Sequence, residues 1–233
     1  MQKISIGKLK KLHYTAEEEY KSLRTNLQLC GKEVKVIGFT SCIPNEGKSS
    51  IVINIARTIA QGGKKVLIID ADMRKSVLIG RHRITKVMGG LSNLLSGFME
   101  LDEVICQTNV PNMFMVLAGP VPPNPSELLS SNVFKSFVKA ASKEFDYVLI
   151  DCPPIGSVTD AAIVSQVCNG MCMVLTANEI SSKFAIHIKD QIEKTGCRIL
   201  GVILNKVKVT RNGYYGKYYG HYYGNRDDAG DGR

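Results

Sequence analysis

The chain has 233 residues, of which 44% are hydrophobic, and its formal net charge is +9 at pH 7. This length fits one large domain or a domain with tails, and the hydrophobic content is sufficient for a full core. No apolar stretch approaches the ~18 residues of a membrane-spanning helix, and the N-terminus shows no apolar secretory signal region. The seven scattered cysteines lack C-x-x-C spacing, so we expect reduced, buried thiols and no metal bound by cysteine.

Short apolar runs alternate with longer amphipathic stretches along the chain. In chain order, we expect helix 17–29, strand 34–40, helix 48–61, strand 66–70, helix 91–97, strand 113–117, helix 126–143, strand 147–151, helix 158–168, strand 170–176, helix 180–195 and strand 199–204. Near-continuous apolar strands separated by helices indicate a parallel sheet covered on both faces. The sequence therefore predicts an α/β fold with one doubly wound, mostly parallel sheet, with ligands at the carboxyl ends of the strands.

The periodicity stops near Lys208, which divides the chain into three expected segments. Residues 1–33 form an N-terminal segment and helix, residues 34–207 form the phosphate-loop domain, and residues 208–233 form a flexible tail. The tail contains three tyrosine pairs, each followed by glycine: Tyr214, Tyr215, Tyr218, Tyr219, Tyr222 and Tyr223. Glycine at this spacing disfavours helix and strand. Read alone, the tail is either a substrate or an adhesive aromatic tract.

The positive charge is concentrated toward the two ends of the chain. Basic tails attract polyanions, including the anionic inner face of a membrane, and tyrosines among basic residues can stack on single-stranded bases. The sequence between the tails contains no recognisable nucleic-acid module. We therefore expect no nucleic-acid partner and favour a position close to a membrane or a membrane protein.

A glycine-bearing loop joins the expected strand 34–40 to the expected helix 48–61. Its nucleotide-binding candidates are Pro44, Asn45, Glu46, Gly47, Lys48, Ser49 and Ser50. Gly47 allows the backbone to approach a phosphate, Lys48 can reach the β- and γ-phosphates, and Ser49 can bind Mg²⁺. Cys42 stands where the general phosphate-loop pattern has its first glycine. With this loop, the expected sheet is of the P-loop NTPase type. The alternative is a simple glycine turn that leads into a helix with an exposed lysine.

Two of the apolar strands end on an aspartate, Asp70 in 66–70 and Asp151 in 147–151. An acid that closes a parallel strand lies in the crevice at the carboxyl end of the sheet, where Mg²⁺ and a nucleotide bind. Asp72 follows two residues after Asp70 and can share its side. These carboxylates can divide the work of holding the metal and accepting a proton. Arg74 either pairs with a carboxylate or phosphate, or is solvated.

With these residues the chain resembles the bacterial tyrosine kinases of capsule and exopolysaccharide synthesis, in their short form without a membrane domain. The resemblance covers nearly the whole chain and is carried by residues 41–50, 66–74, 90–97, 119–129 and 147–154 and by the tail tyrosines. It implies an ATP- and Mg²⁺-dependent protein-tyrosine kinase that phosphorylates its own tail in trans and regulates polysaccharide synthesis and export. It implies Lys48, Asp70, Asp72 and Asp151 as catalytic residues, with Asp70 favoured as the base. It also implies Ser49 and the three aspartates as metal ligands and the six tail tyrosines as phosphate acceptors.

The same resemblance implies partners and a location. Glu18, Lys21, Arg24 and Asn26 match the family motif that supports ring-like self-association, although lysine replaces its first arginine and loses the bidentate fork. The alternative is a solvated amphipathic helix. Other implied partners are a membrane-embedded activator of the chain-length-regulator kind and a cognate tyrosine phosphatase. The kinase would then be cytoplasmic and peripheral at the inner face of the membrane, held there by the activator.

Chromosome-partitioning and division-site ATPases share this fold and provide the competing hypothesis, a nucleotide switch or scaffold without kinase activity. They usually carry a lysine where this chain has Ile43, and their function needs no tyrosine tail. A guanine site would need an aspartate two residues after Lys206, where Lys208 stands, so adenine is favoured. Asn205 either contacts the base or caps a turn.

Overall fold

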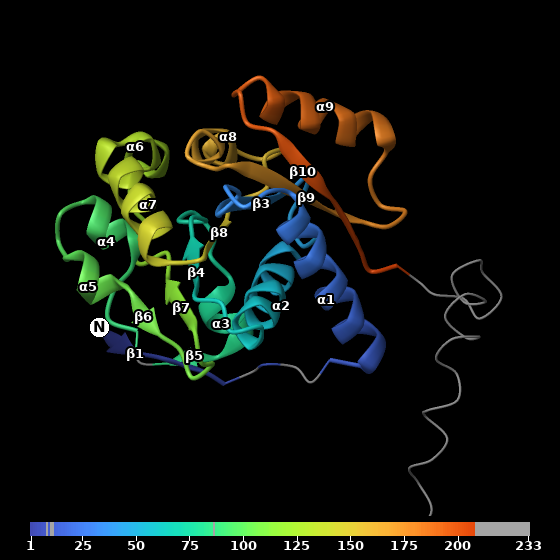
Figure 1. The fold of residues 1–233 in the computed structure, drawn as a ribbon. Coiled ribbons are helices and arrows are strands. Elements are labelled where there is room, and N and C mark those ends of the chain that lie inside the picture. The colour runs from blue at the N-terminus through green and yellow to red at the C-terminus, as the bar shows by residue number, and fades with distance from the viewer. Residues whose placement is uncertain (8, 10–11, 86, 208–233) are drawn as a thin grey trace, which may run out of the picture.

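A single mixed sheet organises the computed structural model, which describes residues 1–7, 9, 12–85 and 87–207. Its eight strands lie in the order β1-β6-β7-β4-β8-β3-β9-β10 (Figure 1). They are β1 (Gln2–Lys3), β6 (Cys106–Gln107), β7 (Met113–Val116), β4 (Val66–Asp70), β8 (Tyr147–Asp151), β3 (Val36–Ser41), β9 (Gly170–Thr176) and β10 (Ile199–Asn205). All neighbouring pairs are parallel except β6 with β7. The predicted doubly wound, mostly parallel fold is confirmed.

Helices cover both faces of this sheet, because its strands bury side chains on both sides. Successive residues of β4 illustrate this: Val66 and Ile68 belong to one hydrophobic cluster, and Leu67 and Ile69 belong to the other. The first face carries α1 (Tyr14–Leu29), α2 (Lys48–Gln61) and α3 (Leu78–His82). The second carries α4 (Leu91–Leu95), α5 (Leu101–Val104), α6 (Pro125–Ser130), α7 (Asn132–Glu144), α8 (Asp160–Ser165) and α9 (Ser182–Glu193). Two separate cores therefore hold the strands in one layer.

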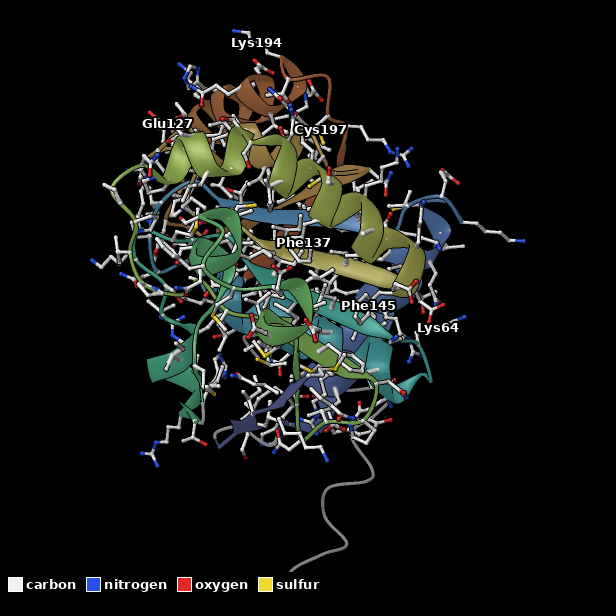
Figure 2. All side chains as sticks on the ribbon, turned by 90° about the vertical axis from the view of Figure 1, so that its left-hand side faces the viewer. Lys64, Glu127, Phe137, Phe145, Lys194 and Cys197 are labelled. Atoms are coloured by element: carbon white, nitrogen blue, oxygen red, sulfur yellow. The ribbon has the colours of Figure 1, made fainter. Side chains whose placement is uncertain are left out.

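The packing of α7 shows how such a helix is specified. Phe137 of α7 has a buried side chain (Figure 2). Phe145, directly after the helix, packs edge-on against Phe114, with ring centroids 5.4 Å apart. Ser131 has an extended backbone, and its hydroxyl accepts a hydrogen bond from Phe134 N at 3.2 Å. The helix predicted over 126–143 is therefore two helices, α6 and α7, because Ser131 ends one and caps the next.

The other differences concern short elements and element ends. The strand predicted from residue 34 begins at Val36, because Val34 N and Lys35 N donate to Gly31 O and Glu33 O in a preceding turn. α1 begins three residues before the predicted helix. The N-terminal segment supplies β1 to the main sheet, and β2 (Ser5–Ile6) pairs with β5 (Ile84–Thr85) in a small antiparallel sheet. Within the described part of the chain, no helix has the length and apolarity needed to cross a membrane.

Candidate nucleotide-binding and catalytic site

The candidate site lies where three neighbouring strands end. The phosphate loop connects the end of β3 to the start of α2, and β8 lies between β3 and β4 in the sheet. Asp70, the last residue of β4, is the register partner of Asp151, the last residue of β8. The parallel topology therefore places both carboxylates at the edge of the sheet from which the loop emerges. Asp151 also pairs in register with Phe39 of β3, two residues before the end of that strand.

Lys48 and Asp151 form a buried ion pair at the centre of this edge. The Lys48 ammonium donates to Asp151 Oδ1, and both side chains are almost fully enclosed. Burial opposes the charge on Lys48, but the adjacent Asp151 carboxylate raises the pKa of Lys48 above its ordinary value. The lysine is therefore held as an ammonium group at the start of α2, where phosphate oxygens would bind.

Asp70 is a buried carboxylate whose two oxygens are both engaged. Its Oδ1 accepts a hydrogen bond from Asp72 N at 3.2 Å, and its Oδ2 accepts one from the Ser76 hydroxyl. Burial, reinforced by the nearby Asp151 charge, raises the pKa of Asp70 to about 7. A carboxylate with a pKa near neutrality is suited to proton transfer.

Asp72 is less enclosed than Asp70 and lies at intermediate burial. Its Oδ1 accepts a hydrogen bond from Lys75 N at 3.0 Å, which closes a turn directly after β4. Partial burial raises the pKa of Asp72 above its ordinary range. The chain thus presents one fully buried and one partly accessible carboxylate on the same loop, and either could act as the base.

Glu46 organises the phosphate loop from inside. Its Oε2 accepts hydrogen bonds from Cys42 N at 2.7 Å and Ile43 N at 3.0 Å, and its Oε1 accepts one from Thr176 N at 2.7 Å. The carboxylate is buried, so its side chain shapes the loop and fastens it to the end of β9. The Glu46 carboxylate thus has a structural role inside the loop, which sequence reasoning did not distinguish from contact with a phosphate.

Gly47 has a backbone conformation that favours glycine. Its φ is +88°, and a Cβ added there would lie 2.2 Å from Asn205 Nδ2. Asn205, the last residue of β10, donates that amide to Glu46 O at 2.7 Å. Asn205 therefore braces the phosphate loop from the end of β10, a contact that neither of the sequence-based alternatives for this residue included.

Arg74, for which the sequence left pairing and solvation as alternatives, is paired with Asp160. Its guanidinium donates to both oxygens of Asp160, at 2.7 and 3.0 Å, and to the Ser126 hydroxyl at 2.8 Å. Asp160 begins α8 and is completely buried. Sequence reasoning missed Asp160, because its only signal was an acid at the start of a predicted helix.

The remaining candidate residues lie in three places. Pro44 and Asn45 are exposed at the tip of the loop, whereas Ser49 is buried beside Lys48 and Ser50 is half-buried. On α1, Lys21 pairs with Glu18 at 2.7 Å, and Arg24 donates to Thr58 O of α2 at 3.1 Å. Asn26 is exposed on the same helix. The six tail tyrosines lie outside the described residues.

The donor chemistry of the site fits Mg²⁺ bound together with a nucleotide. Ser49, Asp70, Asp72 and Asp151 offer hard oxygen donors, which Mg²⁺ prefers. Within residues 1–7, 9, 12–85 and 87–207, no three His, Cys, Asp or Glu side chains converge into a self-sufficient metal site. Mg²⁺ usually takes one or two carboxylates together with phosphate oxygens and waters. The missing Cβ of Gly47 makes room for the Asn205 amide, which holds the loop backbone through Glu46 O.

Comparison with known proteins places these features in a family. A family model described as an AAA domain matches residues 34–195. Tyrosine-protein kinase CpsD of Streptococcus agalactiae is 44% identical over 202 residues, covering 86% of this chain and 88% of its own. Tyrosine-protein kinase YwqD of Bacillus subtilis is 34% identical over 204 residues, covering 85% of this chain and 86% of its own.

Solved structures agree. The chimerical protein CapA2B2 superposes with a TM-score of 0.81 at 31% identity, covering 90% of this chain and 95% of that one. The kinase domain of the Escherichia coli tyrosine kinase ETK gives 0.77 at 32% identity, with 85% and 80% covered. The septum site-determining protein MinD of Pyrococcus horikoshii gives 0.64 at 23% identity, with 73% and 69% covered, and shares the fold. The phosphate loop and the strand-end acids agree with what these relatives are, and the chain belongs to the family of bacterial tyrosine-protein kinases.

Proposed function

We propose that this chain is a protein-tyrosine kinase that uses Mg²⁺ and ATP to phosphorylate its own C-terminal tyrosines in trans. The observation that carries the proposal is the placement of Lys48, Asp70 and Asp151 at one edge of the sheet beside the phosphate loop. The lysine and the start of α2 would bind the phosphates, and Ser49 with the carboxylates would hold the metal. Bound Mg²⁺ would neutralise charge that develops on the transferred phosphoryl group.

The transfer requires a base close to the γ-phosphate. The hydroxyl of a tail tyrosine would attack the phosphorus atom while Asp70 or Asp72 accepts its proton, and ADP would leave. Asp70 has the pKa that suits this role, whereas Asp72 has the greater access. The products balance as ADP and a phosphotyrosine, with the phenolic proton on the enzyme carboxylate.

The position of the last strand supports delivery of the tail to such a crevice. Asn205 ends β10 against the phosphate loop, and Tyr214 follows nine residues later in the sequence. A segment of that length spans at most about 30 Å when extended. We propose that tyrosines along the following stretch reach a crevice on an adjoining subunit and that the glycines let successive pairs enter it.

Self-association and localisation complete the proposal. Residues 1–33, through Glu18, Lys21, Arg24 and Asn26 of α1, would support a ring-like homo-oligomer around the kinase domain 34–207, with residues 208–233 as the acceptor tail. A membrane-embedded activator would recruit the kinase to the inner face of the membrane, and a tyrosine phosphatase would reverse the modification. Through this cycle the kinase would regulate capsular or exopolysaccharide synthesis and export.

A mixing experiment tests both the activity and its direction. One variant carries Lys48→Met with an intact tail, and the other carries an intact site with all six tail tyrosines changed to phenylalanine. Incubated with Mg²⁺ and ATP, neither variant should label itself, whereas the mixture should label the Lys48→Met chain. If ATP is hydrolysed by the wild-type chain and no tyrosine is labelled, the chain is instead a nucleotide switch. If the Phe-tail variant becomes labelled, the acceptors lie elsewhere.

A further inference from the structure

Three segments that are far apart in the sequence meet at Arg74, two residues after Asp72. Arg74 follows β4, Ser126 lies in the first turn of α6, and Asp160 begins α8. The guanidinium donates from Nε to Asp160 Oδ2 at 2.7 Å and from Nη2 to Asp160 Oδ1 at 3.0 Å. The Ser126 hydroxyl closes the group, accepting from Arg74 at 2.8 Å and donating to Asp160 at 2.7 Å.

The burial of this group distinguishes it from ordinary surface ion pairs. Asp160 has no exposed side-chain surface, whereas Arg74 keeps 40% of its side chain accessible. A fully buried carboxylate is stable only when it is paired, and here a bidentate guanidinium and a hydroxyl supply the pairing. The exposed pair Lys189–Glu193 on α9, with both side chains more than 40% accessible, lacks such an arrangement.

Asp72 lies between two anchors because of this group. The first anchor is Asp70. Its carboxylate accepts hydrogen bonds from Asp72 N and from the Ser76 hydroxyl, which fixes both ends of the loop 70–76. The second anchor is Arg74, two residues after Asp72, which is bound to α6 through Ser126 and to α8 through Asp160. The backbone that carries Asp72 is thus restrained from both directions.

We propose that Asp160 is a positioning residue for phosphoryl transfer, which holds Arg74 and thereby orients the Asp72 loop toward the nucleotide. The inference rests on the proposed function, because it assigns Asp72 a part in the reaction or in metal binding. Asp160 itself touches neither the loop 41–50 nor Lys48 among the hydrogen bonds of the described residues. Its loss should therefore affect the transfer step more than the binding of ATP.

The variant that tests the proposal is Asp160→Asn, compared with Glu193→Gln as a matched removal of one carboxylate charge from an ion pair. Asparagine keeps the size of the side chain but removes the charge that holds the guanidinium. We expect kcat for tail phosphorylation to fall about 10- to 100-fold, since small misplacements of reacting groups cost rates of that order. KM for ATP should remain within about twofold, and Glu193→Gln should leave both constants unchanged. Arg74→Lys, which retains charge without the fork, should give an intermediate kcat.

A second variant separates positioning from stability. In Arg74→Met/Asp160→Leu the buried carboxylate and its partner are both removed, and apolar replacement of a buried ion pair is often neutral for stability. We expect this variant to recover the thermal midpoint lost in Asp160→Asn while its kcat stays low. Recovery of kcat together with stability would overturn the proposal, as would an Asp160→Asn variant that raises KM for ATP and leaves kcat intact.

The same variants distinguish a failure of this inference from a failure of the proposed function. Should the wild-type chain hydrolyse Mg·ATP without labelling itself, tail phosphorylation is wrong, and the kcat and KM comparison is made on hydrolysis. The inference predicts the same loss in kcat there, because Asp72 faces the nucleotide in both reactions. Equal hydrolysis rates for wild type and Asp160→Asn would then overturn the positioning role on its own.

Discussion

Lys48 and Asp151 form an ion pair in which the lysine side chain is 7% exposed and the aspartate 2%. The ammonium group proposed to bind phosphate is therefore neutralised by a carboxylate proposed to help hold the metal. The pairing keeps two buried charges compatible with folding.

Lys48→Met tests this ion pair through stability as well as activity. Removing the lysine leaves the Asp151 carboxylate buried without its counter-charge, which should lower the free energy of unfolding by about 3–5 kcal/mol. Lys48→Met/Asp151→Asn should recover much of that loss without recovering ATP binding. Urea unfolding of both variants measures the difference. A Lys48→Met chain as stable as wild type would show that the ion pair does not hold in solution.

Glu46→Gln should loosen the phosphate loop. An amide cannot accept at both ends, so at least one of the backbone donors Cys42 N, Ile43 N and Thr176 N would face an NH₂ group instead of an oxygen. Leaving a buried donor unsatisfied costs about 1–3 kcal/mol, and weaker ATP binding should accompany that loss. Calorimetric titration with ATP and urea unfolding measure the two effects. Glu193→Gln, at an exposed position, should show neither.

Gly47→Ala and Gly63→Ala form a matched pair of backbone substitutions. Both glycines have positive φ, +88° and +79°, so alanine is strained at either position. At Gly63 the new methyl group meets nothing within 4 Å, whereas at Gly47 it would lie 2.2 Å from Asn205 Nδ2. Gly63→Ala should therefore lose about 1 kcal/mol of stability and still bind ATP, since strain at such a position is of that order. Gly47→Ala should lose ATP binding, and equal affinities for the two variants would contradict the account.

Asp160 should give the folded protein a pH-dependent contribution at the acid end. Burial alone would raise the pKa of Asp160, but the hydrogen bonds from Arg74 and Ser126 lower it below its ordinary value overall. A carboxyl with a depressed folded-state pKa stabilises the protein above its unfolded pKa of about 3.9, and that contribution disappears as pH falls through the folded value. The stability gap between wild type and Asp160→Asn should thus be constant above about pH 5 and narrow toward pH 2. A difference in unfolding free energy that grows on acidification would contradict a lowered pKa for Asp160.

Much of the architecture follows from the sequence because local signals coincide with tertiary ones. β4, β8 and β9 have the predicted bounds, since each is a continuous apolar run that a parallel sheet buries on both faces. The two-residue strands β1, β2, β5 and β6 carry no such signal. They exist because pairing with distant segments satisfies their backbone groups, which no local window can reveal.

The site was predictable in its parts but not in its connections. The phosphate loop and the strand-end acids are recognisable, because glycine, lysine and aspartate have few other uses at those junctions. The contacts that hold these parts in place are not recognisable. Asn205 and Glu46 are 159 residues apart in the sequence, and Asp160 and Arg74 are 86 residues apart. Glu46 likewise stands in a polar loop sequence, where a glutamate is usually exposed, and only the folded structure shows that its carboxylate is buried.

Phosphorylation of the tail should weaken self-association. Each phosphotyrosine adds about −1.5 to −2 charges, so six would add on the order of −9 to −12 and reverse the sign of a basic tail. Neighbouring tails in a ring would then repel one another, most strongly at low ionic strength. Light scattering of phosphorylated and dephosphorylated samples measures the change in mass. An unchanged mass for the fully phosphorylated chain would refute a switch of this kind.

The central claim is that the enzyme and its acceptor reside in the same chain. The most direct test is the intact mass of the purified protein after incubation with Mg²⁺ and ATP. The account predicts increments of about 80 Da, each one added phosphoryl group, that disappear when Tyr214, Tyr215, Tyr218, Tyr219, Tyr222 and Tyr223 are all phenylalanine. Increments that persist in that variant, or hydrolysis of ATP without any increment in the wild type, would contradict it.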